Sequence, residues 1–137
     1  MKKVFLNALF LSLATLGFSQ TTFTEQTLNE IHQAFVSNPV QAVTERTLPS
    51  LTMIGDNGAI IDYIVFKSWQ VGGGLAEWKT SEGTVQQSGN LAIAKGISNH
   101  RPKQAKVPYN QRFTETYEFQ NGKWMLASAH FTDITGK

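Results

Sequence analysis

The sequence contains no cysteine. This excludes disulfides, cysteine-ligated zinc, iron–sulfur clusters and cysteine nucleophiles, and it excludes a lipid anchor attached to a cysteine. Histidine is scarce as well: the chain has only His32, His100 and His130, far apart and without the short spacings of metal ligands. We therefore expect no metal site, and the absence of any cofactor motif leads us to expect no cofactor.

The chain also lacks a strong charge of one sign. It has 12 Lys and Arg against 10 Asp and Glu, and Lys2 and Lys3 alone supply the excess. Binding to nucleic acid relies on neutralising phosphates with basic residues. A domain without Lys2 and Lys3 would be neutral, so we expect no nucleic-acid partner.

A long apolar run is present only at the start of the chain. Two lysines precede an apolar stretch over residues 4–18, and small residues lie before a cleavage position between Ser19 and Gln20. This order is typical of a secretory signal peptide, and the run is shorter than the roughly 20 residues of a membrane-spanning helix. We predict a signal peptide over residues 1–19 and one domain over residues 20–137. The protein would be exported, to the periplasm or outside the cell, without a stable membrane anchor.

Hydrophobic spacing predicts helices first and a meandering sheet afterwards. Leu28, Ile31 and Phe35 recur at helical spacing after a capping box that Thr22 and Glu25 would form. The expected elements are helices over about 23–37 and 40–47, strands over 51–54 and 59–61, a third helix from Asp62 to the glycines at 72–74, and strands over 77–87, 91–98, 112–120 and 123–131. The polar segment 99–110, with its basic residues and His100, is expected to be a solvated loop. This order indicates an α+β fold.

The last two strands form the clearest hairpin, because Asn121-Gly122 is a strong two-residue turn signal. An unbroken register places Glu115 opposite Ser128 on one face of the sheet, with His130 as a diagonal neighbour of Glu115. That face is otherwise large and apolar, so we expect the helices to cover it.

The other face of this hairpin is half apolar. Its residues are Arg112, Thr114, Thr116, Glu118, Met125, Ala127, Ala129 and Phe131. An exposed sheet face of this composition indicates a partner. We predict a homodimer packed through it.

The stretch RFTETYEFQNGKWMLASAHFT, residues 112–132, resembles the last hairpin of the nuclear transport factor 2-like (SnoaL-like) superfamily. The shared features are an aromatic strand, an Asn-Gly turn followed by Lys-Trp, an aliphatic strand and a His near its end. The order of the upstream elements is similar over most of residues 22–133.

The resemblance implies a cone: a curved, mostly antiparallel sheet wrapped around a long N-terminal helix, with two short helices and a pocket inside. Many members dimerise through the sheet, and the superfamily includes isomerases, dehydratases, cyclases and non-catalytic modules, so fold alone does not give function. In the similar association domains of calcium/calmodulin-dependent kinases, an Arg and a His occupy the places of Glu115 and His130. This implies that both positions face the pocket.

Two interpretations of Glu115 and His130 stay open at this point. They are candidate catalytic residues, because a carboxylate beside an imidazole orients it and raises its basicity. They could equally be a buried polar pair that satisfies itself, because a lone buried charge is costly.

Five further residues are candidates for ligand binding. Tyr117 and Tyr63 could offer a hydroxyl to a carbonyl group, Ser128 shares the face of Glu115, and Trp69 and Trp78 could line an apolar pocket. Each is also an ordinary core or rim residue in many folds.

The sequence thus predicts an exported domain that binds a small, partly apolar ligand, with proton-transfer chemistry such as isomerisation, dehydration or cyclisation if it is an enzyme. The alternative is a non-catalytic dimeric module for interaction or assembly with a filled or vestigial pocket. The interior distinguishes them, since an open apolar pocket with converging polar groups favours binding.

Overall fold

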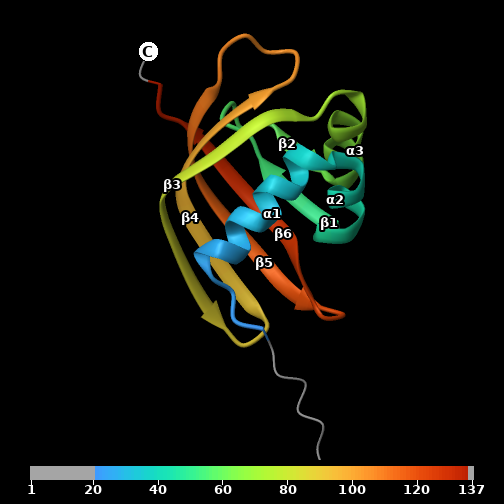
Figure 1. Cartoon of the computed structure of the whole chain (residues 1–137), viewed down its shortest axis with the longest axis vertical. Helices are drawn as coiled ribbons and strands as arrows, with labels where there is room; N and C mark the ends of the chain where they lie inside the picture. The colour runs from blue at the N-terminus through green and yellow to red at the C-terminus, as the bar shows by residue number, and fades with distance from the viewer. Residues whose placement is uncertain (1–20, 136–137) are drawn as a thin grey trace, which may run out of the picture.

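The computed structural model describes residues 21–135 (Figure 1). The predicted signal peptide therefore lies outside the described residues. In chain order the elements are α1 (Glu25–Ser37), α2 (Pro39–Arg46), β1 (Thr47–Ile54), β2 (Ile60–Asp62), α3 (Tyr63–Gly72), β3 (Leu75–Ser88), β4 (Leu91–Pro102), β5 (Tyr109–Gln120) and β6 (Lys123–Asp133). Among the described residues, no helix is both long enough and apolar enough to cross a membrane.

The helices begin and end at local capping signals. The Thr24 hydroxyl accepts a hydrogen bond from the backbone N–H of Thr27 at 3.1 Å, so the capping box of α1 lies two residues after the predicted one. Asp62 caps α3, as expected, by accepting from the N–H of Val65 at 2.9 Å. The chain then leaves α3 through Gly74, whose φ of 65° favours glycine.

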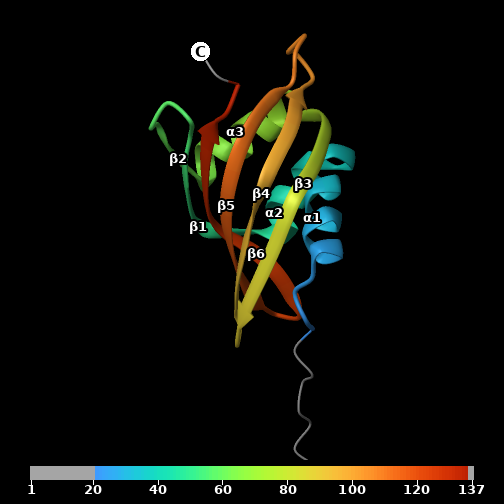
Figure 2. The ribbon, with the colours of Figure 1, turned by 90° about the vertical axis from the view of Figure 1, so that its left-hand side faces the viewer.

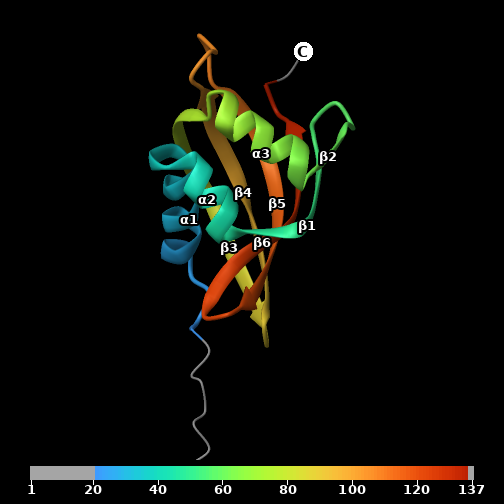
Figure 3. The same cartoon turned by 90° about the vertical axis from the view of Figure 1, so that its right-hand side faces the viewer.

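The six strands of the described chain form one sheet in the order β2-β1-β6-β5-β4-β3. Only β1 and β6 run parallel; the other neighbours are antiparallel. All three helices lie on one side of the curved sheet, with α1 across its middle (Figures 2 and 3). The predicted α+β class, with a curved and mostly antiparallel sheet around a long N-terminal helix and two short ones, is confirmed.

The core lies between α1 and the concave face of the sheet. Leu28, Ile31, His32 and Phe35 are the buried residues of α1, and their spacing gives the helix one inward stripe. The buried aromatic and aliphatic residues of β5 and β6 that complete this layer are Phe113, Tyr117, Trp124, Leu126, Ala129 and Phe131.

Strands β4 and β5 are longer than predicted. The expected loop over 99–110 shrinks to residues 103–108, because β4 continues to Pro102 and β5 already begins at Tyr109. His100 therefore lies on a strand and pairs with Tyr109. The prediction of a solvated loop around His100 is wrong.

A β-bulge interrupts the hairpin of β5 and β6. Tyr117 pairs with Leu126, but the preceding residue Thr116 pairs with Ser128, which leaves Ala127 as an extra residue on β6. A bulge bends its strand and increases the local twist. Here it allows the sheet to curve around the helices.

Beyond the bulge, each side chain of β6 points to the opposite face of the sheet from the one that an unbroken register predicts. His130 lies opposite Thr114 and is exposed, while Glu115 lies opposite Ala129 and is buried. The predicted pairing of Glu115 with Ser128, and the contact of Glu115 with His130, are therefore wrong. A shift of one residue moves every following side chain to the other face of a strand.

The same shift changes the outer face of the sheet. Ala129 and Phe131 were expected there, but they are buried in the core with 4% and 8% of their surface exposed. His130 and Thr132 take the outward positions instead. The outer face of β6 is consequently more polar than the sequence predicts. The exposed aliphatic residues on the outer face of the sheet include Leu91 and Ile93 of β4.

Candidate functional site

A cavity of about 830 Å³ is lined by residues of α3 and of the strands beside it. Figure 3 shows α3 against one end of the sheet. The walls of the cavity come from α3, the β1–β2 turn, β2 and the facing ends of β3, β4, β5 and β6. The aromatic lining residues are Phe66, Trp69, Trp78, Tyr109 and Phe131. The polar lining residues are Asp56, Asn57, Ser68, Gln70, His100, Gln104 and Gln111. Its volume lies within the roughly 300–1,000 Å³ of small-molecule sites.

His100 is the histidine of the cavity lining. Its Nδ1 shares a hydrogen bond of 2.8 Å with the hydroxyl of the buried Ser98. This bond occupies Nδ1, and when Nδ1–H donates to the Ser98 hydroxyl, the neutral ring keeps Nε2 as a proton acceptor. The ring lies among the aromatic rings of Trp78, Tyr109 and Phe131, with centroids 5.6, 5.8 and 6.1 Å away. Burial among these rings lowers the pKa of His100 from its ordinary value of 6.5, so the neutral imidazole is favoured.

Two buried polar atoms of the lining residues lack partners. The carbonyl oxygen Oε1 of Gln70 and the indole Nε1 of Trp78 make no hydrogen bond within the described chain. Both residues are more than nine-tenths buried. Buried polar groups are normally paired, and each exception requires an explanation. Both atoms are enclosed by surrounding side chains, away from the accessible surface of the cavity.

Charge is nearly absent from the lining. Asp56, on the turn after β1, is its one formally charged side chain among the described residues, and it accepts a hydrogen bond of 2.9 Å from Gln111. No Lys or Arg of the described chain lines the cavity. Residues 21–135 also contain no group of three ligand-type side chains that could hold a metal ion.

A buried polar network lies next to the cavity, under α1. His32 Nε2 is 2.9 Å from Oε2 of Glu115, and His32 Nδ1 is 2.8 Å from the hydroxyl of Thr80. Tyr117 donates its hydroxyl to the same Glu115 oxygen at 2.7 Å. Burial, together with the carboxylate of Glu115, raises the pKa of Tyr117 well above its ordinary value of 10, so its hydroxyl keeps its proton.

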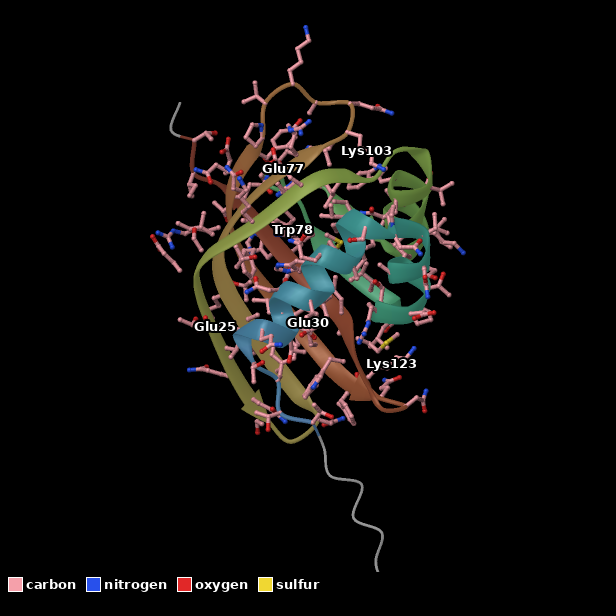
Figure 4. All side chains as sticks on the ribbon, in the orientation of Figure 1. Glu25, Glu30, Glu77, Trp78, Lys103 and Lys123 are labelled. Carbon is pink, nitrogen blue, oxygen red and sulfur yellow. The ribbon has the colours of Figure 1, made fainter. Side chains whose placement is uncertain are left out.

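This network supports one wall of the cavity. The His32 ring stacks on Trp78 with centroids 4.0 Å apart and planes 14° from parallel. Gln33 of α1 also donates to the backbone carbonyl of Trp78 at 2.7 Å, and Figure 4 shows Trp78 where β3 passes α1. These two contacts hold the indole of Trp78 in place. The buried pair of His32 and Glu115 therefore supports the cavity wall at Trp78.

The structure brings together only some of the residues that the sequence singled out. Trp69 and Trp78 line the cavity. Tyr117 is fully buried and bonded to Glu115, so its hydroxyl is used in the core. Tyr63 packs half-buried against the core under Lys67, outside the lining.

The remaining two predicted residues, Ser128 and His130, lie on β6 after the bulge. Ser128 is half-buried opposite Thr116, and His130 is exposed beside a shallow depression of about 200 Å³ that Lys95 and Arg112 also line. Neither residue lines the large cavity. The proximity that suggested a catalytic role for His130 with Glu115 is therefore absent.

The predictions from the sequence missed His100 and the partner of Glu115, although the spacing of residues in the sequence contained a signal for each. Ala92, Ala94, Gly96 and Ser98 are buried at every second position of β4, and continuing this period leads to His100. His32 follows Leu28 by one helical turn and so belongs to the inward stripe of α1. Its contact with Glu115 joins residues 83 positions apart, which local patterns do not reveal.

No protein-family model matches the sequence, and no curated protein matches it. Solved structures do match. A nuclear transport factor 2-like protein from Cytophaga hutchinsonii has a TM-score of 0.70 and 11% identity over 82% of this chain and 100% of that one. A candidate ketosteroid isomerase from Parabacteroides distasonis has a TM-score of 0.64 and 12% identity over 87% and 94% of the two chains.

A candidate dehydratase of the nuclear transport factor 2-like family from Streptomyces avermitilis has a TM-score of 0.67 and 9% identity, and the match covers 82% of this chain and 94% of that one. At these identities the likeness concerns the fold. Together with the strand order and the three helices on the concave face, it shows that the chain has the nuclear transport factor 2-like cone fold.

Proposed function

We propose that this protein is an exported domain that binds a small, partly apolar molecule in the cavity and exchanges a proton with it through His100. The observation that carries the proposal is the cavity itself: about 830 Å³, walled by aromatic rings, with an imidazole among them. A neutral imidazole in such a site accepts a proton from a substrate and returns it.

The chemistry that fits best is proton transfer next to a carbonyl group. His100 Nε2 would take a proton from the carbon beside the carbonyl, and the electron pair of that C–H bond would move onto the carbonyl oxygen. Structural neighbours that carry the names of an isomerase and a dehydratase are compatible with this class.

The alternative is a non-catalytic module with a filled interior. The size of the cavity favours binding over this alternative. The sequence-based candidate His130 remains a competing base, and the same experiment separates it from His100.

The test uses 2-tetralone, a flat ketone with exchangeable protons beside its carbonyl. Binding should change the fluorescence of Trp69 and Trp78, which line the cavity, and Trp69→Phe together with Trp78→Phe should remove the response. Trp124, whose Nε1 donates to the carbonyl of Thr21 at 3.1 Å outside the lining, is the matched control position.

Proton exchange from the ketone into heavy water is then followed by NMR. His100→Gln should retain binding within a few-fold and lose at least roughly a hundredfold in exchange rate, which is the low end for general base catalysis. His130→Gln should exchange like the wild type. Loss of exchange in His130→Gln alone would reassign the base, and absence of any binding would favour the non-catalytic module.

A further inference from the structure

The end of the molecule that holds the cavity has an exposed apolar surface with lysines beside it. We infer that this end docks reversibly on a lipid bilayer that contains anionic lipids, so that the cavity opens towards the lipid. The docking surface consists of Ile60, Ile64, Val65, Trp69, Val71 and Tyr109. This docking goes beyond the proposed function, because it assigns a partner to the surface around the cavity.

Four residues of the docking surface also line the cavity. They keep between 39% and 76% of their surface exposed, and they are Ile60, Val65, Trp69 and Tyr109. A side chain that lines a cavity and keeps this much exposed surface lies where the cavity meets solvent. These four residues therefore form the mouth of the cavity, and the mouth is apolar.

Helix α3 extends this apolar surface. Ile64 and Val71 lie about two helical turns apart, with 70% and 60% of their surface exposed. No other helix or strand of the described chain covers the outer side of α3 (Figure 3). A contiguous exposed apolar surface marks an interaction site. Trp and Tyr, both present at the mouth, are typical of protein surfaces at the boundary between membrane and water.

Three lysines lie beside these apolar residues. Lys67 is on α3, and Lys103 and Lys106 are in the loop between β4 and β5. This loop contacts the end of α3, where Gln104 Nε2 donates to the carbonyl of Gly72 at 3.3 Å, and Figure 4 shows Lys103 near that end. All three lysines are exposed, and none forms an ion pair within the described chain. Lysines at such a surface are attracted to anionic lipid head groups.

The acids at this end of the molecule already have hydrogen-bond donors. Asp56 accepts from Gln111 at 2.9 Å, and Asp62 accepts from the N–H of Val65 at 2.9 Å. Helix α3 and the β4–β5 loop contain no acid. The charge beside the docking surface is therefore positive and complementary to an anionic bilayer. Contact with the same surface of a second copy would place the lysines against one another, so charge favours the bilayer.

Trp69 reports contact with lipid. It is 54% exposed, whereas Trp78 and Trp124 are 9% and 2% exposed. The probe is a vesicle of equal parts phosphatidylcholine and phosphatidylglycerol with bromine on the acyl chains, because bromine quenches an indole that touches it. We expect these vesicles to quench the fluorescence of the full chain. Trp69→Phe, which keeps an aromatic ring on the docking surface, should remove the quenching.

Vesicle sedimentation measures the apolar contribution. Ile64→Gln removes an exposed apolar side chain from the docking surface and should weaken binding to the same mixture of lipids at least about fivefold. Leu91→Gln, a similar change at an exposed position of β4, is the matched control and should bind like the wild type. Urea unfolding of both variants shows that each is folded. Every variant keeps residues 1–19, so a contribution from that segment is the same in each.

The lysines are tested in pairs. Lys103→Gln together with Lys106→Gln should weaken binding to the mixed vesicles at least about fivefold, because two attractions to anionic head groups are lost. Lys79→Gln together with Lys95→Gln removes the same charge from exposed positions of β3 and β4. This control should bind the mixed vesicles within about twofold of the wild type, since salt screens charges that lie away from the lipid.

The outcomes separate a bilayer from other occupants. Absence of vesicle binding, or binding that Ile64→Gln leaves unchanged, overturns the docking surface. A lower mass of Ile64→Gln than of the wild type in light scattering would overturn it as well, by showing that a second copy covers the surface. Docking requires no ligand. Failure of 2-tetralone to bind would therefore leave the docking surface standing, and failure of the vesicles would leave the proposed function standing.

Discussion

The three histidines show how one residue type takes three different environments in this fold. His32 is buried, and both of its ring nitrogens have partners in Glu115 and Thr80. His100 has one nitrogen tied to Ser98 and lies against the cavity. His130 is exposed on the outer face. His100 combines a place in the cavity lining with a lowered pKa, and its Nε2 has no partner within the described chain, which is why the proposed chemistry rests on it.

The lowered pKa of His100 predicts a pH dependence of stability. The unfolded chain takes up a proton at the ordinary value of 6.5, whereas burial makes the folded chain resist protonation until a lower pH. Between these two values the unfolded state binds more protons, so stability falls as the pH drops below about 6.5. We expect His100→Gln to make the fall in unfolding free energy from about pH 7 to about pH 5 shallower than in the wild type.

Urea unfolding at closely spaced pH values measures this slope. His130→Gln, which removes a histidine at an exposed position, is the control variant. A slope for His100→Gln equal to that of the wild type would contradict the assignment of His100 to an apolar setting.

At the scale of elements, the bulge in β6 decides what faces the core. Ala127 is the extra residue, and beyond it Ala129 and Phe131 point inwards while His130 points out. The parallel pairing of β1 with β6 is irregular at the same place, between Thr47 and Thr52. Both strands therefore bend where the sheet wraps around α1, and the cavity wall that includes Phe131 depends on this bend.

Deleting Ala127 should restore an unbroken register and reverse the outer half of β6. Phe131 would then turn to solvent and His130 towards the core, which we expect to cost at least about 3 kcal/mol of unfolding free energy. Ala127→Gly keeps the number of residues and should cost less than about 1 kcal/mol. Urea unfolding compares the two, and equal losses would show that the bulge does not set the register.

At the scale of the whole molecule, the sheet separates two surfaces. Its concave side meets the three helices and ends in the cavity, while no helix of the described chain covers its convex side (Figures 2 and 3). That convex side keeps exposed aliphatic residues in Leu91 and Ile93, with 47% and 40% of their surface exposed, beside the charged Lys95 and Glu118. The predicted homodimer would pack through this convex face.

Dimerisation through the convex face remains a prediction, and Ile93→Lys tests it. A stable interface buries about 800 Å² on each partner, and a lysine at its centre would introduce an unpaired charge. We expect light scattering at high micromolar concentration to give a dimer mass for the wild type and a monomer mass for the variant. Leu48→Lys is unsuitable as a control, because Leu48 is buried. The control is Lys79→Gln, at an exposed position of β3, which should remain dimeric. A monomeric wild type would refute the interface.

The sequence by itself determined the class of fold and most of its elements. Apolar spacing located α1, the Asp62 cap began α3, and Asn121-Gly122 marked the last hairpin, because these signals act between residues close in the chain. Trp69 and Trp78, which are candidates for a pocket wall on the sequence alone, do line the cavity. The export prediction also comes from the sequence alone, since residues 1–19 lie outside the described structure.

The tertiary structure alone decided the site. The partner of Glu115 is His32, from a helix 83 residues earlier, and the cavity joins His100 to Gln70 and Trp78 from different elements. One extra residue at Ala127 moved His130 out of reach of Glu115. Side chains in a strand alternate with a period of two, so a single bulge reverses every later assignment. Whether a bulge forms depends on how the whole sheet must curve around its helices, and no local pattern in the chain records that curvature.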